Sequence, residues 1–207
     1  MSGTSMDGVD VALLETDGEA IHSFGPTASF PYDDAERQLL REALEWARGL
    51  SRRDDRSGVL SIAEGMVTAK HAGAVRAFAE RNGIDLGTVD VVGFHGQTVV
   101  HRPEKGVTVQ IGSGRELSAV LGVPVVFDFR AADMEAGGQG APLVPIFHRA
   151  LALMTGLPLP AAFANIGGIA NVTYVPEGSP DSLVAFDAGP GNCLLDDWAM
   201  RHTGHPI

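Results

Sequence analysis

The sequence predicts a mixed α/β fold, in which helices pack on the faces of a sheet. Two observations support this prediction. From about residue 89 to residue 156, apolar runs typical of buried strands alternate with helical segments. After residues 157–160 the pattern restarts with strands around a Gly-Gly turn, followed by a helix. The restart resembles the strand–turn–strand plan at the beginning of the chain, so we expect a weak internal repeat.

The first eighty residues predict two strands and two helices. The runs "VDVALLETDG" and "AIHSFGPTASFPY" have the pattern of neighbouring antiparallel strands. Asp33 or Asp34 is expected to cap a helix whose apolar residues recur at helical spacing and which ends at Gly49. A longer helix is expected from about Val59 to Arg81, with Asn82-Gly83 as its stop signal.

The middle of the chain predicts the alternating part of the fold. The run "VDVVGFHGQTVVH" is expected to be a buried strand broken by a Gly-His-Gly loop, and "VTVQIG" a short strand. "SGRELSAVLG" predicts a short helix capped by Ser113 and closed by Gly122. "VPVVFDFR" is expected to form a third buried strand. The glycine-rich "EAGGQGAP" then leads into the helix "PLVPIFHRALALMTG".

The end of the chain predicts the beginning of a second domain. "AAFANIGGIANVTYVP" and "SLVAFDAGPGN" are expected to form three strands, and "CLLDDWAMRHTG" a helix. We expect a first domain over residues 1–158 and the start of a second over residues 159–207. About fifty residues are too few for an independent α/β domain, so the second is expected to be incomplete.

Composition narrows the classes of partner. Lys and Arg number 15 and Asp and Glu number 26, which gives a net charge of −11. Nucleic acid binding needs a basic face, whereas backbone N–H groups and a metal can hold a small phosphate ligand without one. Cys193 is the only cysteine, so no internal disulfide can form, which suits a reducing cytosol. We recognise no secretion signal and no bilayer-spanning run, and expect a cytoplasmic protein that binds neither nucleic acid nor membrane.

Two glycine-bearing turns are candidate phosphate-binding loops. In "MSGTSMDGVD", glycines and hydroxyl side chains lie beside exposed N–H groups, and Asp7 or Asp10 can hold Mg²⁺ through water. An ordinary Asp-Gly β-turn is the alternative. In "NIGGIANVT", Gly167, Gly168 and Asn171 offer the same chemistry. One such turn in each repeat favours a shared phosphate ligand.

Several other polar residues are candidates for catalysis or binding. Asp128, Arg130, Asp133 and Glu135 lie at the carboxyl end of a predicted strand, where ligand sites of α/β sheets lie, although Arg130 and Asp133 also fit a surface ion pair. His95, Gln97 and Thr98 suit hydrogen bonding to sugar hydroxyl or acetamido groups rather than a metal site. Arg102 can pair with a carboxylate or phosphate or remain solvated. Asp187 can hold Mg²⁺ or cap the helix that follows.

Five motifs in one order resemble anhydro-N-acetylmuramic acid kinases. They are "MSGTSMDGVD", "GFHGQTVVHRP", "VVFDFRAADMEAGGQGAPLVP", "NIGGIANVTYV" and "FDAGPGNCLLDDW". The resemblance implies the sugar kinase, hexokinase and actin superfamily, whose members have two ribonuclease H-like lobes, here a first lobe and the start of a second. It implies an enzyme that uses ATP and Mg²⁺ to cleave the 1,6-anhydro bridge of anhydro-N-acetylmuramic acid with water and to phosphorylate O6, in peptidoglycan recycling.

The resemblance also implies roles for individual residues. The second ATP loop is "NIGGIANVT", with Gly167, Gly168 and Asn171, and the metal ligands are expected to be Asp7 and Asp187. The catalytic aspartate is expected in "DFRAADMEAGGQGAP", as Asp133, with Asp128 as the competitor. We expect the substrate to contact His95, Gln97, Thr98, Arg102 and Arg130. The first ATP loop consists of Gly3, Thr4, Ser5, Met6, Asp7, Gly8, Val9 and Asp10.

The resemblance carries further expectations about the chain. Family members have a strand before the first loop and most of a second lobe beyond residue 207, so residues 1–207 alone are expected to bind ATP weakly and to turn over little. The resemblance also implies a homodimer. One alternative is a non-catalytic sugar-binding or interaction lobe. Another is a glycoside hydrolase using Asp128 and Asp133, which does not explain two phosphate-type turns.

Overall fold

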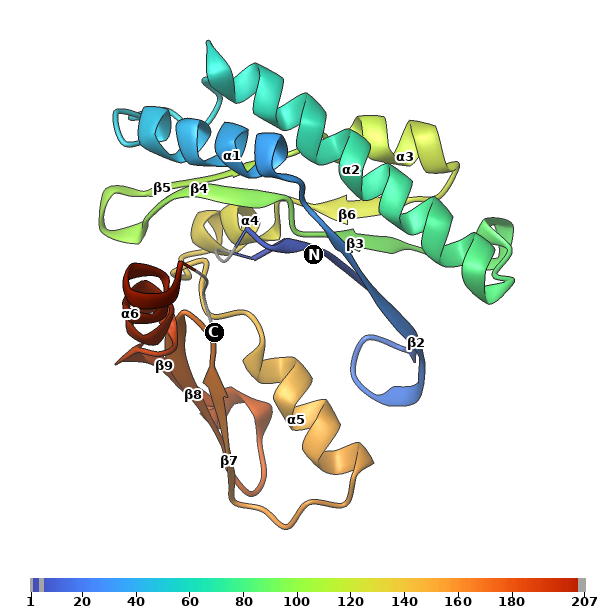
Figure 1. The fold of residues 1–207 in the computed structure, drawn as a ribbon. Helices are drawn as coiled ribbons and strands as arrows, with labels where there is room; N and C mark the ends of the chain where they lie inside the picture. Colours follow the sequence, from blue (N-terminus) through green and yellow to red (C-terminus); the bar gives the residue numbers. More distant parts are fainter. Residues whose placement is uncertain (1, 4–5, 205–207) are drawn as a thin grey trace. The chain divides into compact units, whose positions relative to one another are not determined.

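The structure is a computed structural model, which describes residues 2–3 and 6–204. The chain divides into two compact units. Unit 1 comprises Met1–Leu13 and Gly25–Ala141, and unit 2 comprises Leu14–Phe24 and Pro142–Ile207. The mixed α/β prediction is confirmed, with helices and strands in both units (Figure 1). The domain boundary expected near residue 158 stays a prediction about the whole protein.

Unit 1 packs three helices on one side of its short strands (Figure 1). The antiparallel pair β1 (Gly8–Thr16) and β2 (Ile21–Pro31) precedes the helices, and the tip of this pair belongs to unit 2. The strands β3 and β6 pair in parallel, and β4 and β5 pair antiparallel. The remaining elements of the unit are α1 (Asp34–Ala47), α2 (Val59–Asn82), β3 (Val92–Phe94), β4 (Gln97–Arg102), β5 (Val107–Ile111), α3 (Gly114–Leu121), β6 (Val125–Phe127) and α4 (Phe129–Glu135).

The helix ends of unit 1 follow the predicted signals. Asp33 caps α1 through a capping box, because its Oδ1 accepts from the Glu36 N–H at 2.8 Å and its own N–H donates to Glu36 Oε2 at 2.8 Å. Gly83 ends α2 with a left-handed φ of 63°. Ser113 and Gly122 begin and end α3 as expected.

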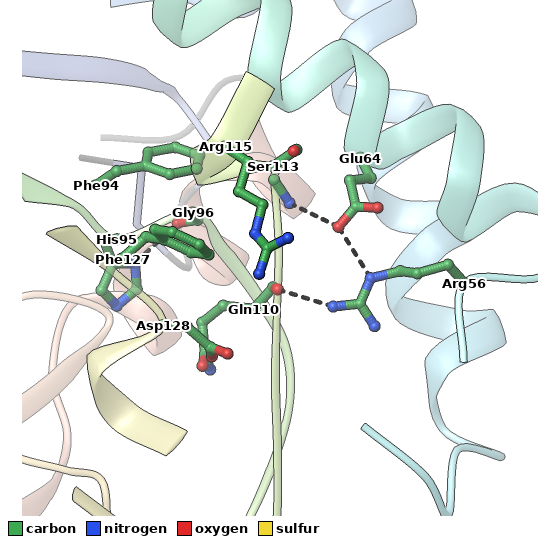
Figure 2. Close-up of a pocket in the computed structure, with 12 residues that line it drawn as sticks. Arg56, Glu64, Phe94, His95, Gly96, Gln110, Ser113, Arg115, Phe127 and Asp128 are labelled. Atoms are coloured by element: carbon green, nitrogen blue, oxygen red, sulfur yellow. Dashed lines mark hydrogen bonds and ion pairs between the residues drawn. The ribbon is translucent and has the colours of Figure 1, made fainter. Parts of the chain in front are cut away.

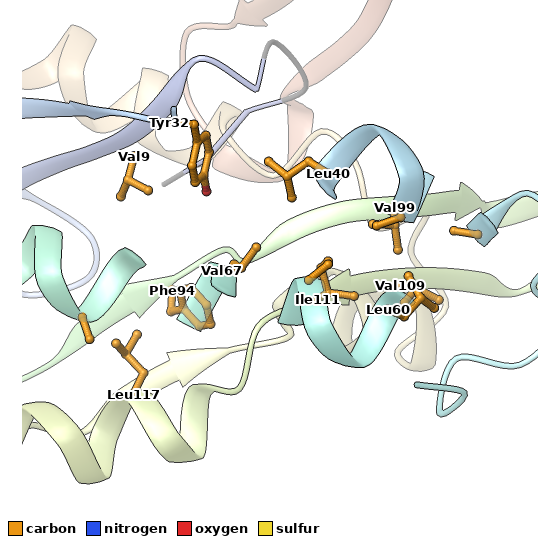
Figure 3. Close-up of a cluster of buried hydrophobic side chains, with 14 of the residues drawn as sticks. Val9, Tyr32, Leu40, Leu60, Val67, Phe94, Val99, Val109, Ile111 and Leu117 are labelled. Carbon is orange, nitrogen blue, oxygen red and sulfur yellow. The ribbon is translucent and has the colours of Figure 1, made fainter. Parts of the chain in front are cut away.

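The core of unit 1 lies between the helices and the β4–β5 pair (Figure 3). Leu40 from α1, Leu60 from α2 and Ile111 from β5 are fully buried. Burying an aliphatic side chain of this size contributes about 1.5–3 kcal/mol. This packing fixes the edge of the unit at which the loops after β3 and β6 begin.

Unit 2 consists of an antiparallel sheet and two helices. The strands β7 (Ala161–Ile166), β8 (Ile169–Val175) and β9 (Val184–Pro190) pair in the order β7-β8-β9. The helices are α5 (Pro145–Met154) and α6 (Cys193–Thr203). A register shift between Ala170 and Asn171 places Asn171 opposite Asp187. The sheet thus presents the Gly167–Gly168 turn at its β7–β8 end.

Two expectations from the sequence are wrong. "VPVVFDFR" is not one buried strand: β6 has only three residues, with Val126 55% and Phe127 39% exposed, and Phe129 already begins α4. The strand ends because Asp128 adopts a left-handed φ of 58°. The capping alternative for Asp187 is also wrong, because the N-cap residue of α6 is Asn192 and no side chain caps that helix.

Candidate functional site

The carboxylate of Asp133 lies against the glycine-rich loop that follows α4. Asp133 Oδ2 accepts a 2.7 Å hydrogen bond from the Gly140 N–H, and the Asp133 carbonyl accepts from the Gly138 N–H at 2.8 Å. A Cβ atom on Gly138 would lie only 2.1 Å from Asp133 Oδ2. Gly138 therefore has to be glycine for the loop to approach the carboxylate this closely, and the loop fixes where the carboxylate points.

Arg130 connects this loop to His95. Its Nε donates to His95 Nε2 at 3.0 Å and its Nη1 donates to the Gly140 carbonyl at 2.8 Å. His95 Nδ1 lies 2.8 Å from the Gly96 carbonyl, which assigns the proton to Nδ1 and leaves Nε2 as an acceptor. Burial and the nearby Arg130 guanidinium lower the pKa of His95, which favours this neutral form.

Asp128, the competitor for the catalytic role, is engaged in an ion pair. Arg53 contacts Asp128 through Nη2 and Glu135 Oε1 through Nη1, the latter at 2.8 Å. Arg53 belongs to the "RRDDR" segment of residues 52–56, in which two aspartates lie next to it in the sequence. No local pattern predicts this pairing, because Arg53 and its partners lie more than seventy residues apart in the chain.

The first glycine loop lies beside the His95 loop. The Ser2 hydroxyl donates to the Gly96 carbonyl at 3.1 Å, and Gln97 Nε2 donates to the Gly3 carbonyl at 3.2 Å. Met6 has a left-handed φ of 54°, and among the described residues only Met6 and Asp128 are non-glycine residues with positive φ. Such conformations are uncommon and concentrate at ligand sites. The first loop and the loop after β3 thus form one continuous region of unit 1.

The remaining residues of the first loop have different surroundings. Asp7 is exposed and its Oδ1 accepts from the Gly8 N–H at 2.9 Å. Gly8 is explained by packing, since a Cβ would meet the Phe30 carbonyl oxygen at 2.5 Å. Val9 is a core residue, and Asp10 accepts from the Ser29 hydroxyl at 2.6 Å. Thr4 and Ser5 lie outside the described residues.

The predicted substrate contacts around β4 have partners within unit 1. Gln97 is only 1% exposed and holds the first loop as described above. Thr98 accepts from Gln110 Nε2 at 3.3 Å. Arg102 donates to the carbonyls of Arg48 at 2.8 Å and Leu50 at 3.4 Å, near the end of α1. These bonds give the three residues structural roles, and their contact with substrate stays a prediction.

The second glycine loop is the β7–β8 turn of unit 2. The carbonyls of Gly167 and Gly168 accept from the N–H groups of Asn192 at 2.7 Å and Gly191 at 2.9 Å. Neither Gly167 nor Gly168 has a left-handed φ, and a Cβ on Gly168 would meet nothing within 4 Å. The fold of unit 2 therefore does not require glycine at 168. An approaching ligand can require it.

A cavity of about 210 Å³ lies in unit 1 between α2, α3, β6 and the His95 loop (Figure 2). Arg56 closes one side, with Nε 2.9 Å from Glu64 Oε1 and Nη2 3.3 Å from the Gln110 carbonyl. His95 and Asp128 line the other side. The cavity therefore adjoins the Arg130–Asp133 region. Of its lining residues, His95 bonds to Arg130, and Asp128 directly precedes α4, the helix that carries Arg130 and Asp133.

No group of three or more His, Cys, Asp or Glu side chains within residues 2–3 and 6–204 forms a ready metal site. Asp7 and Asp187 are both exposed carboxylates. A magnesium ion that travels with a nucleotide needs only one or two carboxylates, because it keeps water and phosphate ligands. In the described parts of the chain, no helix combines the length and hydrophobicity needed to cross a bilayer.

The mixed α/β architecture is consistent with the sugar kinase and actin-like superfamily. The family model for anhydro-N-acetylmuramic acid kinase matches residues 1–207, and the chain belongs to this family.

Curated relatives agree with this assignment. The chain is 58% identical over 207 residues to an anhydro-N-acetylmuramic acid kinase from Nitrobacter winogradskyi and 55% identical over 207 residues to one from Rhodopseudomonas palustris, and each match covers 100% of this chain and 56% of the relative. It is 52% identical over 206 residues to one from Agrobacterium fabrum, covering 99% of this chain and 55% of the relative. The chain thus spans about half the length of these relatives.

Proposed function

We propose that this protein is an ATP-dependent kinase that opens the 1,6-anhydro ring of anhydro-N-acetylmuramic acid with water and phosphorylates O6. The products would be N-acetylmuramic acid 6-phosphate and ADP. The observation that carries this proposal is the family match over residues 1–207. Because the matched relatives are longer, the proposal concerns the activity of the whole protein.

Two glycine loops would hold the nucleotide phosphates through backbone N–H groups. Support for the β7–β8 turn comes from Gly168, for which the described fold gives no internal reason. Support for the first loop comes from the left-handed Met6 and from its ties to Gly96 and Gln97. When bound, ATP with Mg²⁺ supplies the phosphoryl group, and Asp7 and Asp187 would hold the ion.

Asp133 would act as the general base. A water molecule gives its proton to the Asp133 carboxylate while its oxygen bonds to the anomeric carbon. The bond between that carbon and O6 breaks, and O6 takes the γ-phosphoryl group as ADP leaves. Asp133 is favoured over Asp128 because Arg53 already pairs with Asp128, whereas the contacts described for Asp133 are with backbone N–H groups.

His95 and Arg130 would position the sugar. The lowered pKa of His95 favours its neutral form, in which Nε2 accepts from Arg130 Nε, so the Arg130 bond orients the ring. Arg130 also holds the Gly140 carbonyl, so one side chain fixes both the His95 ring and the loop around Asp133. We further propose a cytoplasmic location, where the sugar is recycled from peptidoglycan, and a homodimeric assembly.

Three single substitutions in the full-length protein test the assignment of the base. Asp133→Asn should lower kcat by about 10²–10⁴-fold, the usual contribution of a general base, and leave ATP affinity unchanged. Asp128→Asn should have a much smaller effect on kcat. Asp187→Asn should raise the Mg²⁺ concentration needed for half-maximal rate. Steady-state kinetics with coupled ADP detection measures all three.

The opposite pattern would reassign the base. Unaltered turnover by Asp133→Asn would remove that residue from the mechanism. If Asp187→Asn lost turnover at saturating Mg²⁺ and ATP while it still bound nucleotide, the general base would be assigned to Asp187, on β9.

A further inference from the structure

The cavity of unit 1 is lined by one arginine that has no ion-pair partner among the described residues. Arg56 pairs with Glu64, and Asp128 pairs with Arg53. Arg115 also lines the cavity, and it makes no hydrogen bond or ion pair with the residues that the structure describes. Figure 2 shows its guanidinium group directed into the cavity. The Arg115 guanidinium is therefore available to pair with an anionic group of a ligand.

The walls of the cavity are shaped by glycines against aromatic rings. A Cβ on Gly114 would lie 2.2 Å from Phe127 Cγ, and a Cβ on Gly112 would lie 2.5 Å from Phe94 Cζ. Only glycine at both positions lets these rings lie as close as they do. The rings give the cavity an apolar lining beside the exposed Arg115 guanidinium, to which a carboxylate can form a charge-assisted hydrogen bond.

The size of the cavity limits what it can hold. Sites that enclose a whole drug-sized ligand measure about 300–1,000 Å³. This cavity measures about 210 Å³, so it suits one substituent of a larger molecule. A short carbon chain ending in a carboxylate matches both the apolar walls and the free guanidinium.

We propose that this cavity binds the lactyl group of the sugar substrate, with Arg115 pairing with the lactyl carboxylate. The inference rests on the proposed function, and it names the part of the site that selects a muramic acid over a sugar without the lactyl ether. His95 connects the cavity to the site of chemistry, because it lines the cavity and bonds to Arg130. The N–H groups at the start of α3, which carries Arg115, add to the positive potential.

The test compares two sugars in the full-length enzyme. One is anhydro-N-acetylmuramic acid, and the other is 1,6-anhydro-N-acetylglucosamine, the same bicyclic sugar without the lactyl ether. Arg115→Met removes the charge and keeps the apolar stem. It should raise KM for the first sugar about tenfold to one hundredfold, the usual range for a lost hydrogen bond to a charged group. KM for the second sugar and for ATP should not change.

Two further variants serve as controls. Arg115→Lys keeps the positive charge, so it should recover part of the preference for the muramic sugar. Arg41→Met removes an exposed arginine of α1 that does not line the cavity, and it should behave as wild type. Circular dichroism confirms that each variant is folded.

Each outcome has a defined meaning. A wild-type enzyme that phosphorylates neither sugar contradicts the proposed function itself. An active wild-type enzyme whose preference survives Arg115→Met overturns only this inference. A raised KM for ATP in Arg115→Met would assign the cavity to the nucleotide and would overturn it as well.

Discussion

His71 shows how burial alone changes the chemistry of one residue. The side chain is 3% exposed on α2, and its ring contacts Phe94 edge-on at 4.9 Å between centroids. Its Nδ1 lies 2.7 Å from the Val67 carbonyl, while Nε2 has no partner among the described residues. Burial lowers the pKa of His71 from 6.5 to about 4. The residue is therefore neutral in the folded protein at neutral pH.

This depressed pKa predicts how stability depends on pH. Between pH 6.5 and pH 4 the unfolded chain binds a proton at residue 71 that the folded chain does not, so stability falls as the pH falls through this window. The contribution of His71 to the loss between pH 7.5 and pH 5 is about 2 kcal/mol. Urea unfolding of wild type and His71→Gln at both pH values measures it.

The variant should lose less stability on acidification than wild type does. His22→Gln, at an exposed position of β2, should keep the wild-type pH dependence. Equal pH dependence in His71→Gln and wild type would show that His71 does not titrate abnormally.

Gly138 gives a second prediction at the scale of one residue. Gly138→Ala would place a Cβ within 2.1 Å of Asp133 Oδ2, so the loop or the carboxylate has to move. We expect kcat to fall by about 10²-fold, as for a reacting group displaced by about 1 Å. The matched control is Gly73→Ala, inside α2, where a Cβ meets nothing within 4 Å. It should leave kcat unchanged and raise stability by about 0.5–1 kcal/mol.

Local signals were readable from the sequence at this scale, and long-range partners were not. Asp33 and Gly83 act through backbone groups a few residues away, so their types and positions suffice to predict them. Arg53 pairs with Glu135 of α4 and with Asp128, which precedes that helix, and its own segment reveals neither partner. The same holds for Gln97, expected to face the substrate, which is buried and holds the Gly3 carbonyl.

At the scale of elements, the β7–β8 turn separates two kinds of glycine. Gly168 has open space at its Cβ position, whereas a Cβ on Gly191 would lie 2.1 Å from the Gly167 carbonyl oxygen. The proposed phosphate ligand would account for the first glycine, whereas the close approach of the turn to residue 191 accounts for the second. A substitution at Gly168 therefore tests nucleotide binding, whereas a substitution at Gly191 tests the stability of the fold.

Gly168→Ala should weaken binding of a non-hydrolysable ATP analogue by tenfold or more and leave thermal stability unchanged. Gly191→Ala should destabilise the protein by about 1–3 kcal/mol, the range for an overpacked site. Titration calorimetry and thermal unfolding of the full-length protein measure both. Unchanged nucleotide affinity in Gly168→Ala would argue against phosphate binding at this turn.

Elements with strong periodicity or clear end signals were predictable, and β6 was not. The apolar run of "VPVVFDFR" is typical of a buried strand, but the left-handed Asp128 ends the strand and α4 begins at once. The pattern of apolar residues carries no information about that backbone turn. The same turn at Asp128 starts α4, the helix that places Asp133 beside the glycine-rich loop.

At the scale of the whole molecule, each unit contributes one of the proposed phosphate loops. Unit 1 contains the first loop, His95, Arg130 and Asp133, and unit 2 contains Gly168, Asn171 and Asp187. Five motifs in order were enough to predict the family, because each motif corresponds to one of these segments. The pairing of residues within unit 1 needed the structure.

The most direct test of the proposed function is product analysis of the full-length protein in water enriched in heavy oxygen. With ATP and anhydro-N-acetylmuramic acid, we expect one heavy oxygen on the anomeric carbon, a phosphate on O6, and one ADP per sugar opened. Without ATP, we expect no ring opening. Ring opening that proceeds without ATP, or a phosphorylated sugar whose anhydro bridge is intact, would contradict the account.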